Sequence, residues 1–448
     1  MSKLDSRDSF GSRFGFIMAC IGSAIGVGNI WLFPRRVAAF GAPFLVAYLL
    51  CVVVIGLSGV IGEMAFGRSM QAGTLGAFRG AAEYAGKSRR LGTVAAQIPI
   101  FGSFALAIGY SVVCGWILRY AVGSVTGSVL YAGDITGYIN NFMAISSDTN
   151  NLVFHLIALA AVFLILNSGI SKGIEKVNKV LMPLFFLLFI VIAIYVSGLD
   201  GAKKGYAYMF AGSDWSMLFS GEVWKYALGQ AFFSLSLAGS GTLVYGSYMK
   251  SGEYVPYCAS MVALFDTLAA FVAALAIIPP IYCAGIDMTA EVTSGPGLMF
   301  FYLPMIFSQM PFGRLVAIVF FVAVLFAAVT SLINLFEGPI EALQFNFGGE
   351  RMPAVSLVVG IGAIIAVLIN NIVSDWMDIC SIYNCPVGAL LAAVMFFWVC
   401  GKDFTAAEIE KGGRPGSGKL YAFLGKYVFC FLSVLVLILG SLTKGGIG

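Results

Sequence analysis

Eleven apolar segments follow one another along the chain and are separated by polar connections. They cover residues 14–33, 41–66, 93–124, 152–167, 173–197, 223–247, 255–283, 314–344, 353–371, 376–400 and 421–441. A helix needs about 20 apolar residues to cross the hydrocarbon core of a bilayer. The pattern therefore predicts an all-α polytopic membrane protein, with about eleven transmembrane helices in one transmembrane domain, residues 1–448.

The composition narrows the class further. Of the 448 residues, 60% are hydrophobic and 11% are charged, whereas about 25% of residues are charged in soluble domains. This excludes a soluble enzyme and a disordered chain. The formal net charge of +4 is too small to indicate a nucleic-acid partner. We expect the lipid bilayer as surroundings and no obligatory protein partner.

The sequence contains no motif that would carry catalysis. It has no P-loop, and its single histidine, His155, cannot complete a Ser/His/Asp set. The nine cysteines form no CxxC pair, which argues against a zinc site. They are expected to be small buried hydrophobes, with Cys380 and Cys385 as the pair to check for a disulfide. The protein is therefore not expected to be an enzyme.

Basic residues concentrate in alternate connections. They occur in the polar N-terminus and after the second, fourth and tenth apolar segments, whereas residues 120–171 and 251–313 contain no Lys or Arg. Cytoplasmic loops carry the excess of positive charge. This predicts a multi-pass protein of the cell inner (plasma) membrane with a cytoplasmic N-terminus.

Two apolar segments are interrupted by small and polar residues. The first contains Gly22–Asn29 and then Pro34, and the sixth contains Ser234–Thr242. They are corresponding members of two five-helix halves, about 14–197 and 223–400, with an extra helix at 421–441. Paired breaks indicate an inverted-repeat transporter with its site near the bilayer midplane, because freed backbone groups need protein, water or a ligand. Close packing of small residues is the alternative.

Polar side chains inside other segments are further candidates. Asp266 lies in the seventh segment and could bind a cation, relay a proton or be a protonated hydrogen-bond donor. Thr330 and Ser331 are adjacent in the eighth segment, although such hydroxyls often bond back to their own helix. Tyr110, in the third segment, needs a partner for its hydroxyl.

Several ordered motifs together resemble one family. They are Ser12–Gly15, Gly22–Pro34, Gly62–Arg68, Gly169–Lys176, Gly229–Leu237 and Thr330-Ser331 with Glu337. They cover nearly the whole chain and are similar to the neurotransmitter:sodium symporters, most closely to the bacterial members with eleven spans. The resemblance implies a five-plus-five inverted repeat with broken helices 1 and 6, and Na⁺-driven uptake of amino acids or amines.

The resemblance also implies two sodium sites. The first would use Ala24, Asn29, Ser234 and Asp266. The second would use Gly22, Ile25, Ala327, Thr330 and Ser331. Chloride-dependent relatives have a neutral residue where this chain has Ala270, but Asp266 supplies a fixed negative charge beside the first sodium. We therefore expect that chloride is not required.

The substrate is expected to be an amino acid. Amine-selective relatives have an aspartate at the position of Gly26, so here nothing pairs with an amine, and the substrate carboxylate would meet the first break and Tyr110. The residues expected around it are Ser23, Ala24, Gly26, Gly28, Leu106, Tyr110, Phe233, Ser234, Ser236, Gly239, Ser331 and Leu335. Gly239 replaces a residue that is often aromatic, which suggests room for a medium or large neutral side chain. A smaller polar substrate held by Asn334 is the rival.

The gates depart from the family pattern. Leu32 stands where relatives have the arginine that closes the outer gate against an acid, here Asp378, and Arg36 is a candidate replacement beside Arg35. At the inner gate Arg7 and Phe10 are present, but the expected acid falls near Phe345 and Asn346.

The sequence thus predicts a sodium-coupled symporter that imports a neutral amino acid by alternating access. A proton-coupled amino-acid transporter of the same fold, with Asp266 or Glu337 as carrier, is one alternative. A substrate sensor that does not transport is the other, because both gates are altered.

Overall fold

The computed structural model describes residues 8–147, 150–211, 214–286, 296–413 and 415–443, and all regular structure in these ranges is helical. The first half contains α1 (Arg13–Ala24), α2 (Phe33–Phe40), α3 (Ala42–Ile55), α4 (Ile61–Met70), α5 (Thr74–Tyr84), α6 (Arg89–Thr126), α7 (Ile135–Ser146), α8 (Leu152–Asn167), α9 (Lys176–Ser197), α10 (Ala202–Phe210) and α11 (Gly221–Ser234). The second half contains α12 (Gly241–Ser247), α13 (Val255–Cys283), α14 (Leu303–Gln309), α15 (Gly313–Phe347), α16 (Arg351–Leu368), α17 (Val373–Ile379), α18 (Cys385–Ala393), α19 (Lys402–Glu410), α20 (Gly418–Phe423) and α21 (Cys430–Leu442).

Short wider turns of the π type continue several of these helices. They are Gly28–Leu32, Gly56–Val60, Ile170–Glu175, Leu298–Tyr302, Cys380–Asn384, Val394–Val399 and Leu424–Phe429. Two 3₁₀ turns lie at Trp215–Phe219 and Asn370–Ile372. Two neighbouring helices joined by such a turn form one long membrane-crossing element, as α3 and α4 do over Ala42–Met70.

The predicted multi-pass architecture is confirmed, while the count of eleven stays a prediction. Within the described ranges, eight helical segments are long and apolar enough to cross a bilayer, or nine with the bent pair Arg13–Ala24 and Gly28–Phe40. Two predicted spans fall below that length. α8 has 16 residues, and the sixth segment is divided into α11 with 14 residues and α12 with 7.

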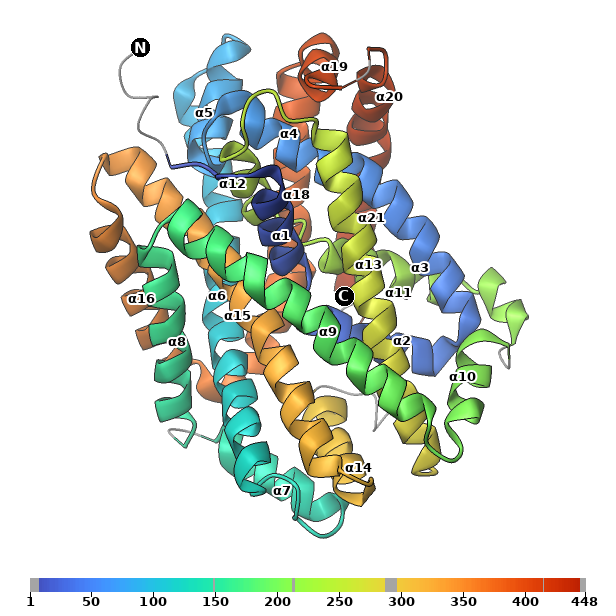
Figure 1. Cartoon of the computed structure of the whole chain (residues 1–448). Coiled ribbons are helices and arrows are strands. Elements are labelled where there is room, and N and C mark those ends of the chain that lie inside the picture. Colours follow the sequence, from blue (N-terminus) through green and yellow to red (C-terminus); the bar gives the residue numbers. More distant parts are fainter. Residues whose placement is uncertain (1–7, 148–149, 212–213, 287–295, 414, 444–448) are drawn as a thin grey trace.

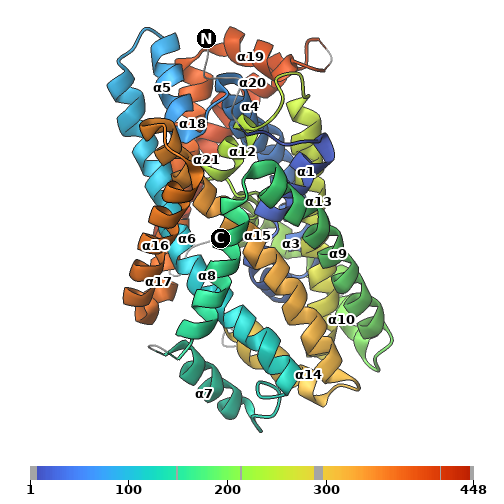
Figure 2. The same ribbon diagram turned by 60° about the vertical axis from the view of Figure 1, so that its left-hand side comes forward.

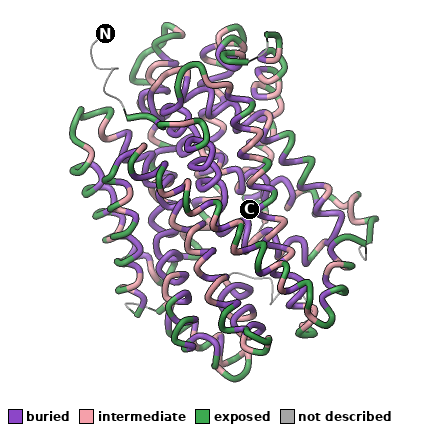
Figure 3. Tube along the Cα trace, in the orientation of Figure 1, coloured by how far each residue is buried: buried purple, intermediate pink, exposed green. Residues whose placement is uncertain are grey.

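Two long helices form the centre of the molecule. α6 and α15 pack against each other along their lengths, and they run together in both views (Figures 1 and 2). In the most apolar 18-residue stretch of α6, 83% of the residues are buried, whereas the corresponding share is only 28% in Ile170–Ser197 and in Arg351–Leu368. Buried residues accordingly fill the middle of the bundle and exposed ones line its outside (Figure 3). In a membrane protein the exposed apolar faces meet lipid.

The two predicted helix breaks are present. α1 ends at Ala24, Ile25 is extended (φ −71°, ψ 111°), and the chain turns by 55° before it continues from Gly28. We call Ile25–Val27 the first break. α11 ends at Ser234 and α12 begins at Gly241, so Leu235–Ser240 is the second break. Ser236 and Gly239 in it have positive φ values of 53° and 69°, which a helix does not allow.

Candidate functional site

A cavity of about 60 Å³ lies between the two breaks, α6 and α15. All but one of the residues expected around a substrate line it, namely Ser23, Ala24, Gly26, Gly28, Leu106, Tyr110, Phe233, Ser234, Ser236, Ser331 and Leu335. Sequence reasoning did not place Val27, Ser103, Leu237, Ala238, Gly241 or Cys385 there, and Asn334, considered only as a rival polar contact, also lines the cavity.

Gly239 is the exception, and it does not open the pocket. Its Cα faces α18, where an added Cβ would lie 2.2 Å from the carbonyl oxygen of Gly388. Its N–H donates to Glu63 Oε1 over 2.8 Å, and its carbonyl accepts from Thr74 Oγ1 over 3.2 Å. The glycine is therefore required by close backbone packing and a positive φ, not by the size of a substrate.

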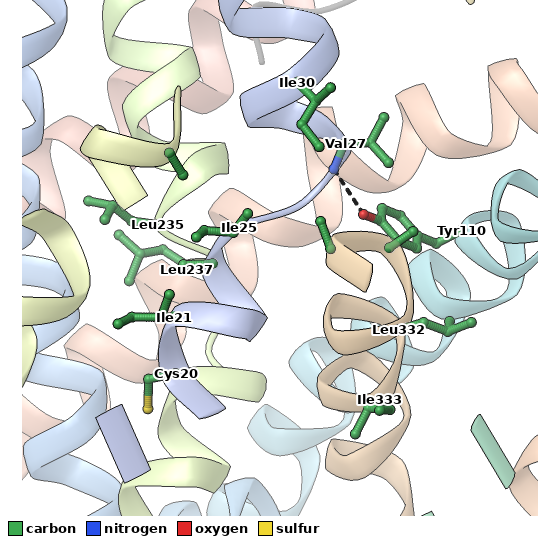
Figure 4. Packing of buried hydrophobic residues seen from close by; sticks show 14 of the residues in the cluster. Cys20, Ile21, Ile25, Val27, Ile30, Tyr110, Leu235, Leu237, Leu332 and Ile333 are labelled. Carbon is green, nitrogen blue, oxygen red and sulfur yellow. Dashed lines mark hydrogen bonds between the residues drawn. The ribbon is translucent and has the colours of Figure 1, made fainter. Parts of the chain in front are cut away.

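Side chains from the two central helices satisfy the first break. Tyr110 Oη accepts a hydrogen bond from the N–H of Val27 over 3.0 Å (Figure 4). Ser331 Oγ lies 2.9 Å from the carbonyl oxygen of Ile25 and 3.3 Å from that of Gly22. The freed backbone groups thus face polar atoms inside the protein, as the bilayer requires.

The two breaks contact each other directly. Ser236 Oγ, in the second break, donates to the carbonyl oxygen of Ser23 over 2.9 Å. Figure 4 shows Leu235 and Leu237 close to Ile25, and these side chains belong to one buried apolar cluster. The alternative of plain helix packing through small residues does not describe this arrangement, because irregular backbone from both segments surrounds one cavity.

The four residues expected at the first sodium site are brought together. Asn29 Nδ2 donates to Asp266 Oδ1 over 2.7 Å, and Ser234 Oγ donates to Asp266 Oδ2 over 2.7 Å. Asp266 is fully buried, and Tyr48 Oη lies 3.5 Å from its Oδ2. Ala24 lines the adjoining cavity. A carboxylate, an amide, a hydroxyl and a carbonyl are oxygen donors that suit a hard cation.

The residues expected at the second site also converge. Besides the Ser331 contacts, Gly22 faces Thr330 so closely that an added Cβ would lie 3.0 Å from Thr330 Cβ. Thr330 Oγ1 bonds back to its own helix, at 3.1 Å from the carbonyl oxygen of Ala327. Sequence reasoning missed buried Asn178, whose Oδ1 lies beside Gly22 without a hydrogen-bond partner among the described atoms.

The outer gate residues lie differently from the expectation. The guanidinium of Arg36 stacks on the Tyr226 ring, 3.6 Å from its centroid, and no ion pair between Arg36 and Asp378 occurs in the described part of the chain. Arg35 is the basic residue whose charge acts on Asp378. Arg36 therefore does not pair with Asp378 in this structure, and of the two candidate arginines Arg35 is the one whose charge reaches that acid.

At the other end, Arg7 lies outside the described residues. Phe10 is buried and packs edge-on against Tyr245 and Tyr248. Tyr248 Oη donates to Glu337 Oε1 over 2.8 Å, and Glu337 forms an ion pair of 2.5 Å with Arg351. The sequence did not indicate a partner for Glu337, because Arg351 belongs to the next helix and its position relative to Glu337 depends on the fold.

The cysteines form no disulfide in the described ranges, and most are buried. Cys380 and Cys385 pack in a small apolar cluster with Leu106. This agrees with the expectation of small buried hydrophobes, with the addition that Cys385 lines the central cavity.

This fold and site define a class: a multi-pass helical membrane transporter built around two interrupted helices. Residues 7–141 and 135–440 match the model of the sodium:neurotransmitter symporter family. The chain belongs to this family. It is a sodium-dependent transporter of a small molecule and not an enzyme.

Known relatives agree with this membership. The uncharacterized sodium-dependent transporter YhdH of Bacillus subtilis is 31% identical, with 97% of each chain covered. The uncharacterized sodium-dependent transporter MJ1319 of Methanocaldococcus jannaschii is 30% identical over 98% of this chain and 92% of its own. The structure of MhsT in complex with L-phenylalanine is similar with a TM-score of 0.85 and 31% identity, covering 97% of this chain and all of that one.

Proposed function

We propose that the protein is a sodium-coupled symporter that imports a neutral amino acid by alternating access. The observation that carries this proposal is the single cavity on which both helix breaks, Tyr110 and Ser331 converge. It is supported by the sodium-dependent relatives and by the amino acid in the similar MhsT complex. The chain would consist of two inverted five-helix halves, about 14–197 and 223–400, followed by the helix at 421–441.

The first break is suited to the substrate carboxylate. The helix that continues from Gly28 presents its N-terminal end to the cavity, where N–H groups and the helix dipole favour an anion. At Gly26 an added Cβ would lie 2.9 Å from Tyr110 Oη and 3.0 Å from Ser331 Oγ. An aspartate here, of the kind that would pair with an amine substrate, would have to displace the Tyr110 and Ser331 hydroxyls from the first break, which favours an amino acid.

We propose that two sodium ions bind at the clustered oxygen donors. The first would be held by Ala24, Asn29, Ser234 and Asp266, and the second by Gly22, Ile25, Ala327, Thr330 and Ser331. Bound sodium supplies positive charge beside the substrate carboxylate. Since the second set joins the first break to α15, sodium binding would favour one arrangement of α1 against the central helices, and the inward gradient would drive uptake.

The substrate side chain is proposed to be apolar and of small or medium size. Leu106, Phe233, Leu237, Ala238 and Leu335 form much of the lining. The rival polar contact is weaker, because Asn334 Nδ2 already donates to the carbonyl oxygen of Gly241 over 3.3 Å. A cavity of about 60 Å³ holds a few water molecules, so an aromatic side chain would require movement of Phe233 or Leu335.

Two measurements test the proposal. Thermal unfolding of the purified protein is measured with each amino acid, with and without sodium, and uptake is then measured in proteoliposomes under an imposed sodium gradient. We expect stabilisation by apolar amino acids only with sodium, followed by concentrative uptake. Uptake driven by a pH gradient without sodium would favour the proton-coupled alternative. Sodium-dependent binding without counterflow would favour the sensor.

We further propose that transport does not need chloride and that the N-terminus is cytoplasmic in the plasma membrane. Asp266 places one carboxylate between Asn29 and Ser234, which supplies the negative charge that chloride would otherwise provide. The basic connections favour the stated orientation. Loss of uptake in chloride-free buffer, or a reporter fused to the N-terminus that is active only outside, would overturn these two points.

A further inference from the structure

A second and larger cavity opens on the outer surface of the bundle. It measures about 360 Å³ and lies between α5, α6, α15 and α16. It shares no lining residue with the central cavity. We call it the lateral groove and define it by Arg79, Thr93, Phe101, Asn346, Leu357 and Ile361.

Most of the lateral groove is apolar and open. Phe101 is 62% exposed, Leu357 53% and Ile361 42%. These side chains lie on α6 and α16, within segments long enough to cross the bilayer. Such exposed apolar side chains face hydrocarbon in a membrane, so the groove has the chemistry to accept an acyl chain.

One end of the groove is polar and carries a positive charge. Arg79, on α5, donates from Nε to Thr93 Oγ1 and from Nη2 to Asn346 Oδ1, both over 2.9 Å. Both acceptors are neutral. Among the residues that the structure describes, no carboxylate forms an ion pair with Arg79, because the nearby Glu83 pairs with Arg89. The guanidinium is thus held in position by neutral acceptors, and in the described part of the chain the charge of Glu83 acts on it without forming an ion pair.

The surroundings of Arg79 add to the positive charge. Lys87, Arg89 and Arg90 follow in the same segment and are all exposed, while Glu83 is the one acid between residues 79 and 90. The basic connections are the ones expected on the cytoplasmic side. Anionic headgroups of the cytoplasmic leaflet attract such clusters.

We propose that the lateral groove binds an anionic phospholipid of the cytoplasmic leaflet. Its phosphate would lie at Arg79, and one acyl chain would follow the apolar wall formed by Phe101, Leu357 and Ile361. The lipid would contact both α6 and α15, which carry Tyr110 and Ser331 of the central cavity. Occupancy is therefore expected to stabilise the part of the protein that holds the transport site.

The test compares two lipids of different charge on the purified full-length protein. Phosphatidylglycerol or phosphatidylcholine is titrated into the detergent-solubilised protein, and the thermal midpoint is followed. We expect phosphatidylglycerol to raise the thermal midpoint at a lower concentration than phosphatidylcholine does. Arg79→Gln should weaken its apparent affinity about fivefold, the factor for one basic group near a membrane surface. Lys176→Gln, an exposed lysine outside the groove, is the matched control and should leave the affinity unchanged.

A second variant guards against misfolding, since Arg79 also bridges α6 and α15. Asn346→Asp keeps an oxygen acceptor at the same position but places a carboxylate against the guanidinium. It should abolish the preference for phosphatidylglycerol without lowering the midpoint in the absence of lipid. Ile361→Trp, which fills part of the groove beside the apolar wall, should weaken the binding of both lipids.

Three results would overturn the proposal. The first is an equal response of the unmodified protein to both lipids, which indicates non-specific solvation. The second is an unchanged phosphatidylglycerol preference in Asn346→Asp. The third is a dimer in native mass spectra that Ile361→Trp disrupts without any loss of bound lipid, since the groove would then be occupied by a second copy of the chain.

Discussion

At the scale of single residues, Gly26 is a position in the first break where an added side chain would meet residues of the site itself. Its environment allows no side chain without displacing Tyr110 or Ser331. Gly26→Ala is expected to raise the KM for the amino acid at least tenfold, because the displaced Tyr110 hydroxyl can no longer meet the first break. Uptake kinetics in proteoliposomes measure this. Gly360→Ala, on the exposed side of α16 with nothing within 4 Å of the added Cβ, is the control, and an equal effect of both would contradict the assignment.

Asp266 is a second residue whose role can be isolated. Its carboxyl group accepts hydrogen bonds from Asn29 and Ser234, so Asp266→Asn removes the proposed source of negative charge while keeping a side chain of similar size. We expect transport by this variant to require chloride and a sodium concentration about tenfold higher. Uptake with chloride replaced by gluconate measures the first effect. Asp375→Asn, an exposed acid on α17, should change neither, and chloride-independent uptake by Asp266→Asn would contradict the reasoning.

At the scale of elements, the second break depends on the close approach of two backbones. Gly239→Ala would place a Cβ 2.2 Å from the carbonyl oxygen of Gly388 and would force an alanine to φ +69°. The backbone strain alone costs about 1–2 kcal/mol, and the overlap adds to it. Thermal unfolding should show a larger loss for Gly239→Ala than for Gly348→Ala, which has φ +66° and open space.

The Gly239→Ala variant also distinguishes a role of Gly239 in backbone packing from a role in substrate selectivity. If Gly239 only positions α12 against α18, the surviving protein should keep its ranking of amino acids. A changed ranking with an unchanged thermal midpoint would instead show that Gly239 sets the size of the pocket.

These cases show where prediction from sequence worked and where it stopped. The breaks could be predicted because glycine and serine clustered inside an apolar run weaken a membrane helix, and two such clusters fall in matching places. Gly239 could not be placed, because an irregular segment has no period that tells which way a residue points. Arg35 and Arg36 are neighbours on a helix and point about 100° apart, so sequence alone could not choose between them. Cys385 lines the cavity from a distant segment and carries no polar signal.

The prediction of the number of spans from the sequence was limited by a different physical fact. Apolar length measures how much chain can sit in hydrocarbon, but not whether a short helix such as α8 reaches both surfaces. In the sequence the sixth segment counts as one span, and its predicted break leaves two helices of 14 and 7 residues, each shorter than a bilayer crossing. Tilt and interruption depend on packing against neighbours, which composition does not record.

At the scale of the whole molecule, one polar network joins the segment before α1 to the end of α12 and to α15 and α16, at the end opposite α7. Phe10 N donates to the carbonyl oxygen of Tyr248 over 3.3 Å, and the Tyr248 hydroxyl contacts the Glu337–Arg351 pair. Tyr248 follows α12, whereas Glu337 and Arg351 belong to α15 and α16. This network holds the segment before α1 against the central helices.

The network gives the last prediction. Tyr248→Phe removes one hydrogen bond to a charged group, worth about 1.5–3 kcal/mol, only in the state where this end is closed. The open population should therefore rise at least tenfold, and amide hydrogen exchange in residues 9–16 should become correspondingly faster. Tyr138→Phe loses a comparable hydroxyl contact, to Leu130 and Ser308 at the α7 end, and should leave that segment unchanged. Equal exchange in the two variants would mean that the network only packs the core. Faster exchange in Tyr248→Phe that substrate and sodium reverse would instead show that it opposes inward opening, because ligands that favour a closed end counteract the lost bond by mass action.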